Sequence, residues 1–82
     1  NREEEELGQF LSRTPATLNS GGRWIVLSYH SLEDRLVKHA FQRLAREGSL
    51  RLLTKKVIQP GADEVRANPR ARSAKMRVAE KI

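Results

Sequence analysis

A continuous apolar run, Trp24-Ile25-Val26-Leu27, is followed within a few residues by a long amphipathic helix pattern. Four apolar residues without a polar interruption are typical of a strand that is buried on both faces, as in a parallel sheet, and predict a strand over 24–29. The helix pattern covers 32–47, where apolar residues recur on one face at helical spacing. Gly48 follows as the expected C-terminal cap. A strand that leads directly into such a helix indicates an α/β fold.

The remaining elements follow from the same signals. A helix is predicted over 3–13, because acidic residues fill its first turn and Pro15 ends it. A second strand over 50–58, a short helix over 62–67 and a third strand over 73–80 complete the chain. The first two strands flank a crossover helix and should therefore run parallel. The connection to the third strand is short, so this strand should return antiparallel.

The chain has 82 residues, enough for one small domain. It has no cysteine, which excludes disulfides and thiolate metal sites and fits a cytoplasmic protein. The longest apolar run is four residues, too short for a membrane span. The net charge is +6, and residues 48–82 hold nine basic and three acidic side chains. A basic segment of this kind is typical of a surface that binds a polyanion, and the alternative is ordinary solvated surface charge.

A first polar cluster follows the apolar run at His30-Ser31-Leu32-Glu33-Asp34-Arg35. In open α/β sheets, ligands bind at this end of the strands. Ser31 is predicted to cap the helix, with Asp34 completing a capping box, and its loss should cost roughly 0.5–2 kcal/mol. His30 precedes the cap, where its side chain can face a substrate, although a lone histidine is commonly structural. His39 has no ligand set around it that would suit a metal site.

A second polar cluster, Asn68-Pro69-Arg70-Ala71-Arg72-Ser73, precedes the third strand. If that strand returns antiparallel, its start lies at the same sheet edge as His30, and the two clusters converge. Arginine suits phosphate because its guanidinium forms a rigid bidentate fork. Lys55 and Lys56 could extend the basic surface, and Tyr29 could stack on a base, whereas Trp24 is expected in the core.

Three segments resemble one family closely, the bacterial 16S rRNA cytosine-N4 methyltransferases. The first is Gly21-Gly22-Arg23 with the strand and the segment from His30 to Lys38, the second is Leu53-Thr54-Lys55-Lys56, and the third runs from Asn68 to Glu80. The resemblance covers essentially the whole chain. Pro15, Ser20 and Glu4 depart from the family pattern, which leaves the packing of the first helix open and the motifs intact.

The resemblance implies an enzyme that transfers a methyl group from S-adenosylmethionine to the N4 amine of a cytosine in the small ribosomal subunit. It matches only the C-terminal part of the family. Residues 1–82 would form the three-strand C-terminal portion of a Rossmann-like sheet, and the cofactor would be held by an N-terminal half that this chain lacks. It places the catalytic site at His30, Ser31 and Asp34. The RNA-binding residues would be Tyr29, Lys55, Lys56, Asn68, Arg70, Arg72 and Lys75.

The role of His30 stays open between orienting the cytosine, contacting the RNA backbone and helping to remove the amine proton. Two other functions compete with the methyltransferase. One is a basic RNA-binding module without catalysis, which the absence of bound S-adenosylmethionine would favour. The other is a hydrolase that uses His30 and Ser31, which is disfavoured because no oxyanion-stabilising element accompanies them.

Overall fold

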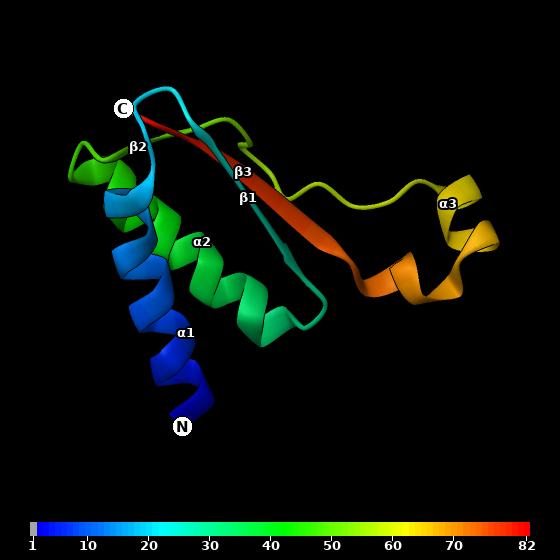
Figure 1. Cartoon of the computed structure of the whole chain (residues 1–82). Helices are drawn as coiled ribbons and strands as arrows, with labels where there is room; N and C mark the ends of the chain where they lie inside the picture. The colour runs from blue at the N-terminus through cyan, green and yellow to red at the C-terminus, as the bar shows by residue number, and fades with distance from the viewer. Residues whose placement is uncertain (1) are drawn as a thin grey trace.

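The computed structural model describes residues 2–82 as a small α/β unit (Figure 1). In chain order the elements are α1 (Arg2–Arg13), the 3-10 helix η1 (Thr14–Thr17), β1 (Arg23–Ser28), α2 (Ser31–Arg46), β2 (Leu50–Leu52), α3 (Ala62–Ala67), the 3-10 helix η2 (Pro69–Ser73) and β3 (Lys75–Lys81). The predicted helices and the first and last predicted strands are confirmed within about two residues at each end. The second predicted strand, 50–58, is wrong in length, because only its first three residues form β2.

The ends of the two long helices follow from local chemistry. Pro15 cannot continue α1, and the chain passes instead into η1, where Pro15 is buried. At the end of α2, Gly48 adopts a left-handed conformation with φ of 83°. The next amide, that of Ser49, donates to the carbonyl of Leu44 at 2.9 Å. The predicted glycine cap of this helix is therefore confirmed, and the chain reverses towards β2.

The sheet has the strand order β1-β3-β2, and both pairings are antiparallel. The antiparallel return of the last strand is confirmed. Because β1 and β2 each run antiparallel to β3, they run parallel to one another, as predicted, but they are not neighbours, since β3 lies between them. A helix is about 10 Å wide and strands are spaced about 4.8 Å apart, so the crossover through α2 leaves room for one strand between β1 and β2.

One face of this sheet is covered by α1 and α2, which lie side by side (Figure 1). Trp24 of β1 packs against Phe41 of α2, with ring centroids 5.1 Å apart. The core around this pair consists of Leu11, Trp24, Val37, Phe41, Leu44, Leu50 and Ala79. The expected core position of Trp24 is confirmed, and all three strands and both long helices contribute to this single cluster.

The opposite face of the sheet is exposed and apolar. Ile25 is 58% exposed and Leu27 is 50% exposed, while Trp24 and Ser28 on the same strand are buried. Among residues 2–82, therefore, β1 is buried on one face only, and the expectation of burial on both faces is not met. Beyond the sheet, α3 and η2 pack on each other and project past the start of β3 (Figure 1).

Candidate functional site

The turn between β1 and α2 carries Tyr29 and His30, and both side chains are exposed. His30 has an extended backbone, with φ of −124°, and it is the last residue before the helix. Its carbonyl accepts a hydrogen bond from the amide of Asp34 at 3.0 Å, which closes the first turn of α2. The turn therefore presents the His30 side chain at the end of β1, as the sequence predicted.

The predicted capping box is wrong. Ser31 is already the first helical residue, and no side chain caps the start of α2. A capping hydroxyl has to come from a residue with non-helical backbone angles, and His30 occupies that position instead. Asp34 cannot complete a box either, since its carboxylate is bound elsewhere.

Asp34 is held by Arg77 of β3. The Nε of Arg77 donates to Oδ1 of Asp34 at 2.8 Å, and its Nη2 donates to Oδ2 at 3.0 Å. Each side chain is only 13% exposed. These hydrogen bonds lower the pKa of Asp34, burial opposes them, and the charges of Arg77, Lys75 and Lys38 lower it further. Asp34 is therefore an ionised carboxylate locked to the sheet, poorly suited to transfer a proton near neutral pH.

The two polar clusters meet as predicted. Ser28, the last residue of β1, is paired with Lys75, the first residue of β3. Tyr29 and His30, which come directly after Ser28, therefore begin beside the point where η2 leads into β3. Lys75 is partly buried, and its Nζ donates to the carbonyl of Ser73 at 3.3 Å. The convergence of the strand ends is confirmed, whereas the functional roles of these residues stay predictions.

The arginines of the second cluster lie on η2, and both Arg70 and Arg72 are exposed. Asn68 precedes them, and its Oδ1 accepts a hydrogen bond from the amide of Arg70 at 3.2 Å. Asn68 therefore caps the start of η2, a structural task that the sequence analysis did not assign to it. Together with Pro69, this cap fixes the backbone from which the two guanidinium groups project.

Lys55 and Lys56 occupy the segment after β2, and both are exposed. This segment stays attached to β3 on the side opposite β1. The amide of Val78 donates to Oγ1 of Thr54 at 3.2 Å, and Ile58 exchanges two hydrogen bonds of 2.9 Å with Met76. The two lysines are thus held between two anchoring points beside β3, along a different edge from His30.

A cavity of about 280 Å³ lies beside His30, between the starts of α1 and α2. Its apolar lining comes from leucines of both helices, and carboxylates stand around it. The lining residues are Glu3, Glu4, Leu7, His30, Leu32, Glu33 and Leu36. The contribution of α1 to this cavity was not predicted from the sequence, because an acidic first turn is already explained by the helix dipole.

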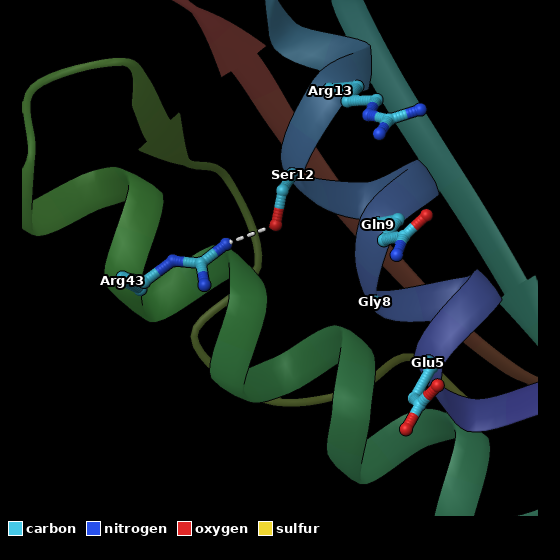
Figure 2. Close-up of a pocket in the computed structure, with 6 residues that line it drawn as sticks. All are labelled: Glu5, Gly8, Gln9, Ser12, Arg13 and Arg43. Atoms are coloured by element: carbon cyan, nitrogen blue, oxygen red, sulfur yellow. Dashed lines mark hydrogen bonds between the residues drawn. The ribbon is translucent and has the colours of Figure 1, made fainter. Parts of the chain in front are cut away.

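A larger hollow, of about 400 Å³, lies further along α1, towards its C-terminal end (Figure 2). It is lined by Glu5, Gly8, Gln9, Ser12, Arg13 and Arg43. Figure 2 shows Arg43 of α2 reaching towards Ser12 of α1, and its Nη2 donates to Oγ of Ser12 at 2.7 Å. This hollow shares no lining residue with the cavity beside His30 and contains none of the predicted site residues, so it is not the candidate site.

Residues 2–82 contain no group of three or more histidine, cysteine or acidic side chains placed to hold a metal ion. None of the helices in the same range has the length and apolar character that crossing a bilayer requires. The candidate site consists of the His30 turn, its neighbouring cavity and the basic segment that leads into β3.

Comparison with known proteins gives a consistent result. The MraW methylase family model matches residues 1–82. The chain is 55% identical over 82 residues to the ribosomal RNA small subunit methyltransferase H of a Cyanothece species, covering 100% of this chain and 27% of that protein. It is 53% identical over 81 residues to the protein of the same name from Pseudothermotoga lettingae, covering 99% of this chain and 27% of that protein. The chain thus spans about a quarter of the length of these relatives.

Proposed function

Because the chain belongs to the MraW methylase family, we propose that it is part of a longer enzyme that methylates the N4 amine of a cytosine in 16S rRNA, using S-adenosylmethionine. This enzyme would act on the small ribosomal subunit in the cytoplasm. The observation that carries the proposal is the pairing of Ser28 with Lys75, which brings the His30 turn to the basic segment 68–75. A reacting base and the phosphates beside it could then be held by one edge of the sheet.

The exposed parts of the sheet support the assignment to a larger unit. β1 is an edge strand in residues 2–82, so its backbone groups on one side have no strand partner there. Its outward residues Ile25 and Leu27 belong to an apolar surface that one helical layer cannot cover. Exposed apolar edges of this kind favour further pairing and packing. We therefore propose that the chain is the C-terminal portion of a Rossmann-like domain whose sheet continues beyond β1.

The residues described here do not fit a cofactor cradle. In Rossmann-like folds, the nucleotide-containing ligand lies on a glycine-rich turn that follows a strand. Gly21 and Gly22 instead precede β1, where the amide of Gly22 donates to the carbonyl of Asn19 at 2.8 Å. A Cβ at Gly22 would lie 2.9 Å from that carbonyl oxygen, so this glycine serves a tight turn. We therefore assign S-adenosylmethionine to the rest of the enzyme and the substrate side to this chain.

Within that assignment, His30 orients the target cytosine. An exocyclic aromatic amine reacts when its lone pair is aimed at the methyl donor, so correct placement is the main requirement. Tyr29 is 50% exposed and adjoins His30, where its ring could stack on a base. Arg70 and Arg72 would bind the neighbouring phosphates, and Lys55, Lys56 and Lys75 would extend the basic surface. Asp34 then supports the turn, and neither Ser31 nor Asp34 reacts itself.

The central test compares two histidines of the complete enzyme. His30→Ala should lower methyl transfer to 16S rRNA by on the order of 100-fold, because a misplaced substrate loses the geometry that the reaction needs. His39→Ala is the matched control, since His39 is an exposed histidine on α2 that lines no part of the cavity beside His30. Full activity of the His30→Ala enzyme, with a normal unfolding transition, would remove His30 from the site.

A second experiment tests whether S-adenosylmethionine is bound by the rest of the enzyme and not by this chain. Calorimetric titration of the 82-residue chain with S-adenosylmethionine should give no measurable heat of binding, whereas the complete enzyme should bind it. Micromolar affinity in the isolated chain would overturn the assignment of the cofactor to the rest of the enzyme. If the complete protein binds RNA but neither binds S-adenosylmethionine nor methylates rRNA, the RNA-binding module without catalysis is the correct function.

A further inference from the structure

Arg77 is absent from the predicted site, yet it contacts α2, the helix that follows His30. It lies on the helix-covered face of β3, where it pairs with Val26 of β1. Its guanidinium forms two hydrogen bonds with the carboxylate of Asp34, and the side chains are largely shielded from water. A side-on bidentate contact fixes both the distance and the orientation of its partners, which a single hydrogen bond does not do.

The same aspartate is also hydrogen-bonded to the backbone of His30. The amide of Asp34 donates to the carbonyl of His30 at 3.0 Å. Two successive contacts therefore join β3 to the turn, first from Arg77 to the Asp34 carboxylate and then from the Asp34 amide to His30. Since no side chain among residues 2–82 caps the start of α2, this path adds a tertiary constraint on its first turn.

Two further cations lie near the Asp34 carboxylate. Lys38 of α2 and Lys75 of β3 also act on the Asp34 carboxylate. Asp34 thus stands among cations from both elements and holds together groups that would otherwise repel one another. Loss of Asp34 or Arg77 would change the separation between the first turn of α2 and the start of β3, where the two polar clusters meet.

We infer that Arg77 is a positioning residue that sets where His30 stands relative to the basic segment 68–75, acting through Asp34. This inference rests on the proposed function, because it assigns Arg77 a task in the placement of the target cytosine. The segment that binds phosphate and the turn that holds the base would therefore keep a fixed spacing.

The experiment uses Arg77→Met and Arg77→Lys in the complete enzyme. Arg77→Met keeps much of the aliphatic stem and removes both hydrogen bonds, and it should lower kcat by on the order of 10- to 100-fold. KM for rRNA and the salt dependence of RNA binding should stay at parent values, because the phosphate-binding side chains are intact. Arg77→Lys keeps the charge but replaces the bidentate fork by a single ammonium group, and it should recover part of kcat. The matched control is Arg51→Met, which breaks the Arg51–Glu80 ion pair at the far end of the same strand.

A spectroscopic readout separates placement from stability. In the complete enzyme, the ring resonances of His30 should shift in Arg77→Met and stay unchanged in Arg51→Met, while those of His39 stay unchanged in both. If Arg77→Met does not fold, Arg77→Lys decides, since loss of one of the two hydrogen bonds should still shift His30 and lower kcat. Parent values of both quantities in a folded variant would overturn the inference.

The outcome also distinguishes this inference from the proposed function. If His30→Ala is inactive while Arg77→Met turns over like the parent, the proposed function stands and the positioning role is wrong. If His30→Ala is itself fully active, the proposed role of His30 fails, and the positioning role of Arg77 fails with it.

Discussion

Arg77 of β3 and Asp34 of α2 form a bidentate ion pair across 43 residues of sequence. Both side chains are 13% exposed, and the pair joins the sheet to the first turn of the helix that follows His30. Each partner would leave an uncompensated, poorly hydrated charge if the other were removed. The consequences of that arrangement can be measured in the 82-residue chain itself.

Removal of one partner should destabilise the chain strongly. Arg77→Met should lower the free energy of unfolding by about 3 kcal/mol, because Asp34 then stays buried without its partner. Asp34→Asn combined with Arg77→Met should lose clearly less than the sum of the two single changes. Urea denaturation of the parent, both single variants and the double variant gives the coupling. Arg51→Met is the control, since that exposed pair should contribute only roughly 0.2–1 kcal/mol. Strict additivity would show that the pair does not act as a unit.

The pair should also make stability depend on acid. Hydrogen bonding to Arg77 lowers the pKa of Asp34 in the folded chain below its unfolded value of about 3.9. A depressed carboxyl pKa contributes stability above the unfolded pKa and loses it as pH falls through the folded pKa. The difference in unfolding free energy between the parent and Asp34→Asn should be constant above about pH 5 and shrink below about pH 4. A constant difference down to the acid limit would contradict this account.

Ser31→Ala should be close to neutral. Ser31 lies inside the helix, is exposed and does not cap α2, so its hydroxyl contributes little to folding. The expected change in unfolding free energy is within about 0.5 kcal/mol, as for other surface substitutions. Thermal and urea unfolding of the 82-residue chain measure it. A loss above 1 kcal/mol, about the usual value of an N-terminal cap, would restore the capping role that the sequence suggested.

The outer face of β1 should respond differently in the chain and in the complete enzyme. Ile25 is 58% exposed in the chain, so Ile25→Lys should change the stability of the chain by at most about 0.5 kcal/mol. If the rest of the enzyme covers this face, the same substitution should destabilise the complete protein by about 3 kcal/mol or more, because a charge is then buried among apolar groups. The chain serves as the matched control. Equal, small effects in both proteins would argue against a covered outer face.

Arg70 and Arg72 should bind phosphate without reading sequence. Replacement of both by alanine in the complete enzyme should flatten the slope of log affinity against log salt by about 1.4–1.8, if each arginine holds one phosphate of the RNA. Affinity for unrelated single-stranded RNA should fall by about the same factor as affinity for 16S rRNA, because phosphate contacts carry no base identity. The control replaces Arg13 and Arg46, two exposed arginines of the helical layer, and should leave the slope unchanged. An unaltered slope in the Arg70 and Arg72 variant would place the RNA path elsewhere.

Local patterns in the sequence were sufficient for most elements. The periodicity over 32–47, the glycine at 48 and the proline at 15 each act within a few residues, so α2 and its cap and the end of α1 could be predicted. β2 could not, because its end depends on contacts with a distant strand. Thr54 accepts a hydrogen bond from Val78 through its hydroxyl, and the regular ladder stops there. Residues 53–58 have an apolar pattern but only one further bridge to β3.

Tertiary structure alone decided the strand order and the partner of Asp34. In β3, the charged residues Lys75 and Arg77 lie on the side that faces the helices, whereas Met76 and Val78 face outwards. Arg77 can lie on the covered face because it pairs there with the carboxylate of Asp34, which is 43 residues away in the sequence. The sequence by itself determined the helices, the end strands, the basic segment and the position of His30 at a strand end. The structure alone decided which groups meet across the sheet. Strand order and ion-pair partners are set by packing between elements that are distant in sequence, so no local pattern predicts them.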